Sequence, residues 1–336
     1  MGPSESYGFE RVKARVWPPK LRDELLSIAP AFSIDDLLRH RVIILLGKGG
    51  VGRTSVAAAI ALVAAGRGMR TLVIETDPER PIAASYGHTT GLEPVALEPH
   101  VWSLFLGGQE SLEDYLGLVV PRTVLRAIFA SSLYRHFVNA APALRELTMM
   151  GKIYHEIERR PKNKMPWDVL VVDAPASGQA LGMVRMPFVA RETFGSGIVG
   201  DEAGEVARFF RDSAKCAIIA VTTPEVLAVA ETLEIHRTLR DLRLATAAVV
   251  FNRTSMGGFE ARDITRMIAM ASRHARLASV SELAEIARSD LRRRHLERRA
   301  LGLIQRQIAA PVVMLTEHHE LWGRKLSAGL AAELAG

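Results

Sequence analysis

The sequence has 336 residues, of which 48% are hydrophobic and 24% charged, and it contains a single cysteine. This composition can form a large core, which excludes an intrinsically disordered chain. The one thiol, that of Cys216, cannot form an internal disulfide or complete a Cys₄ or Cys₂His₂ zinc site. We therefore expect a protein of the reducing cytoplasm that holds no zinc. The longest apolar run, Val56 to Ala65, is too short to cross a bilayer, so we expect no transmembrane segment.

Arginine dominates the basic residues, since only 8 of the 43 are lysines, and the formal net charge is +6. The segment from Arg262 to Arg306 holds 11 arginines and 5 acidic residues, an excess as large as that of the whole chain. Such a segment can face nucleic acid or another anionic partner. Because the acids are interleaved and no aromatic residue occurs there, we favour solvated helices over nucleic-acid binding.

The first predicted elements surround a glycine-rich turn. Residues 1–40 contain prolines and charged turns and are predicted to be an N-terminal extension. Arg41 to Leu46 is a compact apolar run that predicts a buried strand, and Ser55 to Ala65 predicts an alanine-rich helix. Thr71 to Ile74 predicts a second strand, which would close a right-handed, parallel βαβ unit.

Further apolar runs rich in β-branched residues predict four more strands: Val169–Val172, Ala217–Val221, Ala247–Phe251 and Pro311–Leu315. None alternates between apolar and polar residues, as expected for strands covered on both faces. Helical tracts lie between the strands, and a doubly wound, mostly parallel α/β sheet follows from this alternation. The predicted helical insertions lie at about 108–162, 186–212 and 261–308.

The turn after the first strand reads Gly47-Lys48-Gly49-Gly50-Val51-Gly52-Arg53-Thr54-Ser55. A glycine-rich turn between a strand and a helix lets successive backbone N–H groups surround a phosphate, and the helix N-terminus adds a favourable dipole. Thr54 is placed to bind Mg²⁺ through its hydroxyl, and Ser55 to contact the α-phosphate. The sequence therefore predicts one P-loop NTPase domain, residues 41–336, that binds ATP or ADP with Mg²⁺.

One position departs from the standard loop, because Arg53 stands where a lysine normally contacts the β- and γ-phosphates. A guanidinium keeps the charge but is planar and bulkier than an ammonium. The arginine bias of the whole chain is a second explanation for Arg53. The same bias makes Lys48 informative, since a lysine inside this loop indicates a specific contact.

A lysine directly after the first loop glycine resembles the deviant Walker A loop of one class of dimeric ATPases. Two further stretches resemble motifs of its ArsA-like branch, the arsenical pump and tail-anchored-protein targeting ATPases: Glu75-Thr76-Asp77-Pro78, and Asp173-Ala-Pro-Ala-Ser-Gly178-Gln179 followed by Pro187. The resemblance covers residues 41 to about 315, which correspond to one ATPase half. It implies an ATPase fold and a dimer that closes on nucleotide.

The resemblance gives these residues roles. In that class the lysine equivalent to Lys48 reaches the partner's nucleotide, and the asparagine equivalent to Asn252 contacts adenine. The Gly178 amide is placed to sense the γ-phosphate. Asp173 and Asp77 follow buried strands at the same carboxyl edge, where Asp173 would hold Mg²⁺ through water. Either acid could instead cap a helix, and Asn252 could instead serve turn chemistry.

Three departures from the family pattern bear on activity. Ala84 stands where an ungapped alignment places the aspartate that orients the attacking water. Gln179 replaces a histidine of the second switch and could itself position water. The cysteines that hold zinc or arsenite in family members have no counterpart. Arg53 and Ala84 together predict slow hydrolysis, or hydrolysis completed by a partner subunit.

The sequence thus predicts an ATP-binding switch that works as a homodimer or with a related ATPase subunit. Closure would move the second switch, Asp173 to Pro187, together with an apolar client surface formed by Met183, Met186, Phe188 and Phe194. The alternative, which we favour for each of the four side chains taken singly, is that it belongs to the core. Two other functions stay open: a nucleotide-loaded scaffold without turnover, and an ATPase that positions DNA or membranes through Arg262–Arg306.

Overall fold

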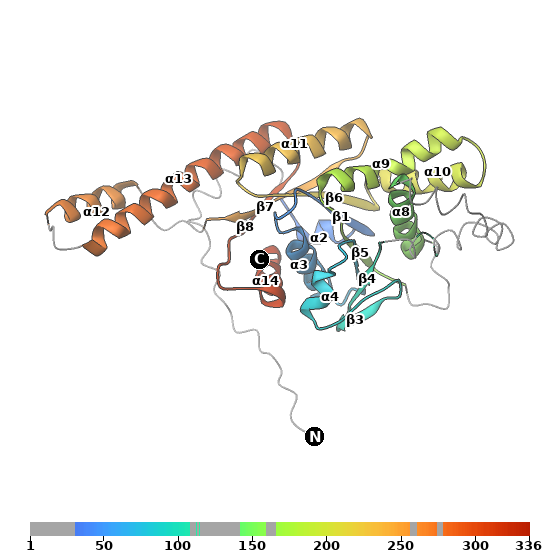
Figure 1. Ribbon diagram of the computed structural model, residues 1–336, viewed down its shortest axis with the longest axis horizontal. Coiled ribbons are helices and arrows are strands. Elements are labelled where there is room, and N and C mark those ends of the chain that lie inside the picture. Colours follow the sequence, from blue (N-terminus) through green and yellow to red (C-terminus); the bar gives the residue numbers. More distant parts are fainter. Residues whose placement is uncertain are drawn as a thin grey trace, which may run out of the picture.

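The computed structural model describes residues 31–107, 112, 114, 142–158, 166–255, 261–273 and 278–336. At its centre is an eight-stranded sheet with the order β3-β4-β2-β5-β1-β6-β7-β8, flanked by helices (Figure 1). All neighbouring strands are parallel except β3 and β4, which are antiparallel. This confirms the predicted α/β class and the mostly parallel sheet.

Six strands lie where the sequence predicts them: β1 (Val42–Leu46), β2 (Thr71–Glu75), β5 (Val169–Asp173), β6 (Cys216–Thr222), β7 (Thr246–Thr254) and β8 (Val312–Thr316). Every residue of β1, β2, β5 and β6 is buried. Side chains alternate between the two faces, so that Ile43 and Leu45 enter one core while Ile44 and Leu46 enter the other. Coverage on both faces explains why these strands read as continuous apolar runs.

The sequence analysis missed two strands, β3 (Val95–Glu98) and β4 (Val101–Phe105). They form an antiparallel hairpin with a register shift between Ala96 and Glu98. β3 is short and only partly buried, which leaves little apolar signal. β4 joins the sheet by pairing in parallel with β2. The position of these two strands at the edge of the sheet therefore depends on the pairing of β4 with β2.

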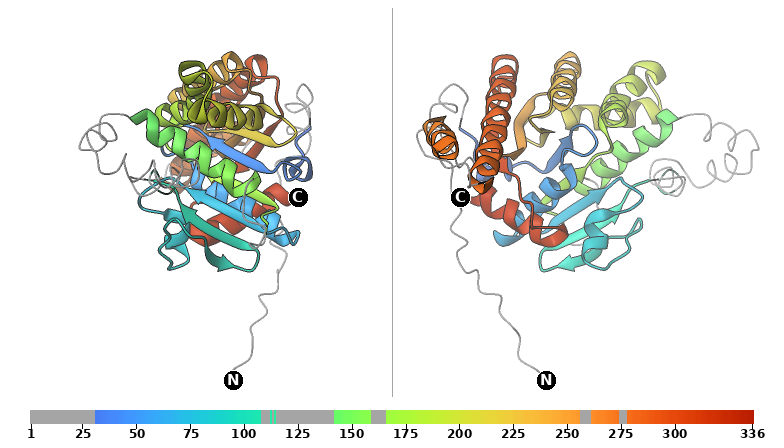
Figure 2. Two further views of the ribbon diagram at one scale, coloured as in Figure 1. Left: turned by 90° about the vertical axis from the view of Figure 1, so that its right-hand side faces the viewer. Right: turned by 60° about the vertical axis from the view of Figure 1, so that its left-hand side comes forward.

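One face of the sheet packs against α2 (Ile34–Leu37), α3 (Arg53–Gly66), α4 (Pro81–Ser85) and α14 (Gly323–Ala335). The other face packs against α8 (Pro142–Glu158), α9 (Ser177–Phe194), α10 (Ile198–Arg211) and α11 (Val226–Asp241). Figure 2 shows these two layers on either side of the sheet. The two faces thus carry separate apolar cores.

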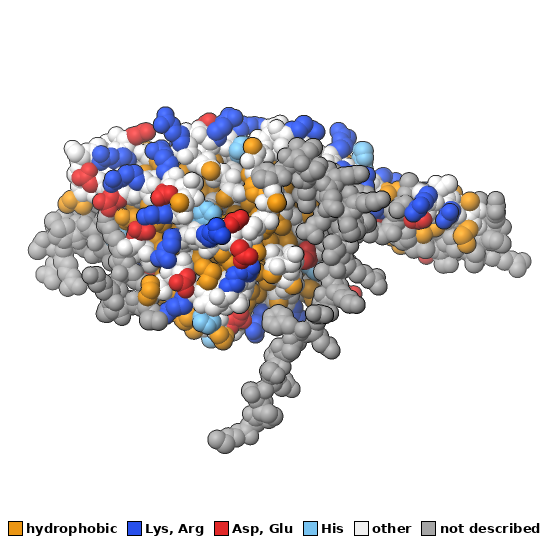
Figure 3. All heavy atoms as spheres, turned by 180° about the vertical axis from the view of Figure 1, so that it is seen from behind, with side chains coloured by type: hydrophobic (Ala, Val, Ile, Leu, Met, Phe, Trp, Pro, Cys, Tyr) orange, Lys and Arg blue, Asp and Glu red, His pale blue; other side chains and the backbone are white. Residues whose placement is uncertain are grey.

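The helices α12 (Ala261–Arg273) and α13 (Ala278–Gln307) form an arm that extends beyond the sheet edge (Figure 1). The C-terminal part of α13 packs on the β7–β8 side through Leu301 and Ile304. On the face shown in Figure 3, basic side chains of the arm are mixed with acidic and apolar ones. The 30 residues of α13 give a length of about 45 Å at 1.5 Å per residue.

The predicted client surface is wrong for two of its four residues. Met183 and Phe188 are buried in the core beneath α9, because this face of the helix points toward the sheet. Met186 is partly buried, and only Phe194 is clearly exposed, at 53%. Most of the predicted insertion at about 108–162 and residues 1–30 of the predicted N-terminal extension lie outside the described residues. Within the described part of the chain, no helix is both long and apolar enough to cross a membrane.

Candidate nucleotide-binding site

The glycine-rich loop lies between β1 and α3, in the middle of the sheet, where β1 is flanked by β5 and β6. Gly50 and Gly52 adopt positive φ angles of 85° and 89°. The helix α3 begins without a side-chain cap and has no acid in its first turn. Its positive end therefore faces the carboxyl edge of the sheet, which is where open α/β sheets bind anionic ligands.

Residues near the ends of β6 and β7 contact the loop. A Cβ added at Gly47 would lie 2.3 Å from the backbone oxygen of Val221 in β6. The Nδ2 group of buried Asn252, in β7, donates a hydrogen bond of 2.8 Å to the backbone oxygen of Val51. These contacts leave room only for glycine at position 47 and give Asn252 a bracing contact with the loop. The adenine contact predicted for Asn252 stays a prediction.

Thr54 and Asp173, the two residues predicted to hold Mg²⁺, are in contact at the base of the loop. The Thr54 hydroxyl donates to Asp173 Oδ2 at 2.6 Å, and the Thr76 hydroxyl donates to the backbone oxygen of Asp173 at 2.9 Å. Burial raises the pKa of Asp173 to about 6, although the Thr54 hydrogen bond and the charge of Arg53 both act to lower it. The other carboxylate oxygen, Oδ1, is buried and has no hydrogen-bond partner among the described residues. A hydroxyl beside a carboxylate with a spare oxygen fits the oxygen-rich coordination of Mg²⁺.

Arg53 bends back toward its own loop. Its guanidinium donates to the backbone oxygen of Gly47 at 3.0 Å and also to the backbone oxygen of Pro175. Burial lowers the pKa of Arg53, while the charges of Asp173 and Asp77 act in the opposite direction. The arginine therefore ties the phosphate loop to the segment that follows β5.

Lys48 points to a different neighbour. Its ammonium lies 3.8 Å from Oε1 of Glu231 on α11, and both side chains are about one-third exposed or less. The other carboxylate oxygen of Glu231 accepts a hydrogen bond of 2.6 Å from the Ser177 hydroxyl, at the start of α9. Glu231 therefore joins the phosphate loop to the second-switch segment. Glu231 was not predicted as a site residue. Its only signal in the sequence is an acidic residue in the helix that follows β6, the strand beside β1.

Three remaining candidates lie at the same sheet edge but are more exposed. Gly178 and Gln179 occupy the first turn of α9 and are exposed. Asp77 accepts a hydrogen bond of 2.9 Å from the Glu79 amide, which is turn chemistry, and its charge also acts on Arg53 of the loop. Ala84 is exposed in α4.

Glu75, at the end of β2, is a buried carboxylate that the sequence analysis quoted only as part of a motif. It accepts hydrogen bonds from the Ile82 and Ala83 amides at 2.7 and 3.1 Å and from the Ser103 hydroxyl at 2.7 Å. An anion at the N-terminus of a short helix is favoured by the unpaired amides there. Glu75 thus fixes the position of α4 relative to the site.

The family model described as "Anion-transporting ATPase" matches residues 40–199, which include the loop, Asp77, Asp173 and Gln179. This part of the chain is therefore similar to the ArsA-like ATPases. A relative named ATPase BagA, from Mycobacterium tuberculosis, is 29% identical over 240 residues, which cover 67% of this chain and 68% of the relative. The ATPase ASNA1 homolog of Trypanosoma cruzi is 23% identical over 286 residues, covering 68% and 78%. The family model and both of these relatives carry the name ATPase.

Proposed function

We propose that this ArsA-like ATPase is a cytoplasmic, nucleotide-driven switch in which two protomers close face to face on ATP and Mg²⁺. The second protomer is another copy of the chain or a related ATPase subunit, and closure controls a partner or client protein. The observation that carries the proposal is the different placement of the two basic loop residues. Arg53 is turned into its own loop, whereas the partly exposed Lys48 is directed away from it, toward Glu231.

Each loop residue then has a distinct task. The backbone amides from Gly49 to Ser55 hold the phosphates at the positive end of α3. Thr54 and Asp173 would hold Mg²⁺, Thr54 directly and Asp173 through water, and the ion would neutralise charge on the phosphates. Arg53 neutralises phosphate charge within its own protomer, and Lys48 supplies the contact with the partner's nucleotide.

The second switch would transmit the nucleotide state. The Gly178 amide and the Gln179 side chain lie in the first turn of α9, at the same sheet edge as the loop. Gln179 would position the attacking water, and Gly178 would bind the γ-phosphate. Because Ser177 also bonds Glu231, movement of this turn would change the surroundings of Lys48.

The test is nucleotide-dependent dimerisation measured by light scattering coupled to size-exclusion chromatography. We expect the wild-type chain to dimerise with a non-hydrolysable ATP analogue and Mg²⁺ but not with ADP, and the Lys48→Ala variant to stay monomeric. Lys325→Ala, a lysine in α14, is the matched control. If Lys48→Ala dimerises as readily as the wild type, the contact in trans is wrong.

A second candidate, a scaffold that binds nucleotide without turnover, is favoured by the engagement of Arg53 with backbone oxygens and by Ala84. Steady-state hydrolysis separates the two functions. An active switch hydrolyses ATP measurably, whereas a scaffold gains activity only in the double variant Arg53→Lys, Ala84→Asp. If neither the wild type nor the double variant hydrolyses ATP, the residues at positions 53 and 84 are not what prevents hydrolysis.

A further inference from the structure

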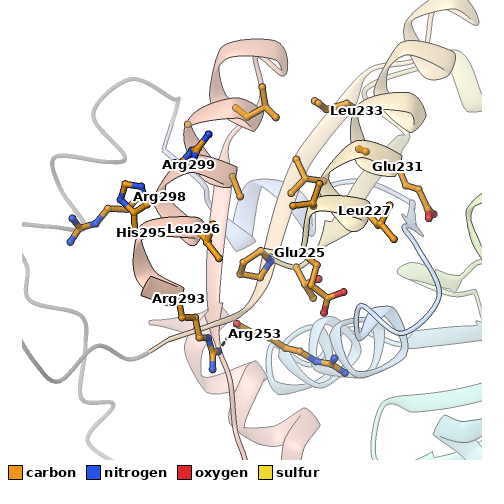
Figure 4. Close-up of a pocket in the computed structure, with 18 of the residues that line it drawn as sticks. Glu225, Leu227, Glu231, Leu233, Arg253, Arg293, His295, Leu296, Arg298 and Arg299 are labelled. Atoms are coloured by element: carbon orange, nitrogen blue, oxygen red, sulfur yellow. Dashed lines mark hydrogen bonds between the residues drawn. The ribbon is translucent and has the colours of Figure 1, made fainter. Parts of the chain in front are cut away.

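A groove of about 1440 Å³ lies between α11 and α13 (Figure 4). Both helices project to the same side of the sheet (Figure 2). Its floor is the edge of the apolar cluster that joins these helices to β7, and it includes Val229 and Leu233 from α11 and Leu303 from α13. The groove is larger than the 300–1,000 Å³ typical of small-molecule sites. Its size suits a peptide segment.

Large apolar side chains stand exposed on both walls. Val226 and Leu227, in the first turn of α11, are 80% and 65% exposed. Leu296 of α13 is 55% exposed and faces the groove from the opposite wall (Figure 4). Single exposed apolar residues need no explanation, but three that line one groove with an apolar floor indicate a surface for a partner.

The two walls differ in charge. On the α13 wall, Arg298, Arg299 and Arg306 line the groove, and none of them forms an ion pair within the described part of the chain. On the α11 wall, Glu225 and Glu234 line it and are likewise unpaired among the described residues, and Arg237 of the same helix also lines it. No ion pair joins the two walls among the described residues, so a complementary occupant presents its acids toward α13 rather than toward α11.

We propose that this groove docks an amphipathic helix of a partner protein, with an apolar stripe on the floor and acidic side chains along its α13 edge. A docked helix forms its backbone hydrogen bonds internally. Its fit to a groove between two helices therefore depends on side-chain contacts. The arginines of α13 select an acidic edge, and the carboxylates of α11 reject an occupant that is acidic on both edges. The docking does not depend on hydrolysis of ATP.

Other occupants fit the groove less well. A nucleic acid would place phosphates against Glu225 and Glu234 and would leave the apolar floor uncovered. A second copy that presented its amphipathic helix α12 would bring Arg262 and Arg266 to the basic wall. Both occupants therefore become outcomes of the test rather than the proposal.

The groove also adjoins the nucleotide site. Glu231 lines it and contacts Lys48 of the phosphate loop, and Arg253, which lines it too, directly follows Asn252. Arg293 donates to the backbone oxygen of Arg253 at 3.2 Å. A helix docked here would lie against residues that also contact the loop.

The experiment uses a fluorescein-labelled synthetic helix of about 18 residues, with a leucine stripe at helical spacing and glutamates on one edge. A second peptide has every glutamate replaced by lysine, and a DNA duplex of similar charge is the third probe. Binding to the full-length chain is measured by fluorescence anisotropy. We expect the glutamate peptide to bind at least about tenfold more tightly than the lysine peptide.

Two groove variants, Leu296→Asp and the double change Arg298→Glu, Arg299→Glu, should each weaken that binding about tenfold. The matched control is Arg266→Glu, Arg288→Glu, which makes the same charge change at exposed positions of the arm outside the groove. Circular dichroism checks that every variant is folded.

Four results would overturn the proposal. The first is absence of binding by the glutamate peptide, and the second is equal binding of both peptides. The third is a control variant that weakens binding as much as the groove variants do. The fourth is an occupant of another kind: DNA that competes with the peptide, or a groove variant that changes the oligomeric state in light scattering.

Discussion

The phosphate loop and the α11–α13 groove are neighbours at the sheet edge, but they are built in different ways. The loop comes from contiguous residues held by buried backbone and side-chain contacts, such as the bond between Asn252 and Val51. The groove comes from segments about sixty residues apart in sequence, with exposed apolar side chains and unpaired charges. The shape of the loop is therefore fixed by contacts within the chain, whereas the apolar side chains Val226, Leu227 and Leu296 of the groove are exposed to solvent.

The largest effect should come from the loop's closest backbone contact. Gly47→Ala would place a methyl group 2.3 Å from the Val221 oxygen, so we expect a loss of about 3 kcal/mol in the free energy of unfolding. ADP binding should fall sharply as the loop shifts. Gly49→Ala is the control, since nothing lies within 4 Å of the added Cβ. Urea unfolding and calorimetric titration would measure both, and equal effects of the two variants would contradict the close packing.

The next effect has the opposite sign, and it concerns Asp173. A carboxyl pKa raised to about 6 means that the ionised group opposes folding, so the protein loses stability as the pH rises through 6. Asp173→Asn should therefore increase the free energy of unfolding, without nucleotide or Mg²⁺, by about 2–3 kcal/mol at pH 7 and less at about pH 5. Mg²⁺-dependent hydrolysis should fall at the same time. A variant less stable than the wild type at pH 7 would show that burial does not strain this carboxylate.

The third prediction concerns the hydrogen bonds that hold α13, the helix that forms one wall of the groove. Glu297 on α13 is buried and accepts hydrogen bonds from the Ser255 amide and hydroxyl at 2.9 and 2.8 Å and from Arg293 at 3.2 Å. Glu297→Gln exchanges one acceptor for a donor, and we expect a loss of about 2 kcal/mol in urea unfolding. Glu285→Gln, at an exposed position of the same helix, should change stability by less than about 0.5 kcal/mol. If both variants lose a similar free energy of unfolding, α13 is held by its apolar contacts alone.

The smallest effect concerns the link between the two regions. The Lys48–Glu231 pair is partly exposed, and such pairs contribute only about 0–1 kcal/mol. Glu231→Gln should therefore speed the acylation of the Lys48 amine by an amine-reactive ester about two- to fivefold, as resolved by peptide mass spectrometry. Glu234→Gln, an exposed carboxylate of the same helix, is the control. If the labelling rate of Lys48 is unchanged in Glu231→Gln, the Lys48–Glu231 pair does not link the loop to the groove.

The sequence by itself determined the centre of the protein. Fully buried parallel strands must be apolar throughout, so β1, β2, β5 and β6 were predictable from their composition. Glycines in a strand–turn–helix context predicted the phosphate loop, because few residues can turn the backbone in that way. The meeting of Thr54 with Asp173 followed from the rule that parallel strands end at one edge.

Only the tertiary structure decided what lies around that centre. The hairpin of β3 and β4 depends on pairing with β2, and the burial of Met183 and Phe188 depends on which face α9 turns to the sheet. Glu231 meets Lys48 and Ser177 only because three segments distant in sequence converge. The groove likewise needs α11 and α13 side by side. Local pattern fixes a strand or a loop, but contacts between distant segments depend on how the whole chain packs.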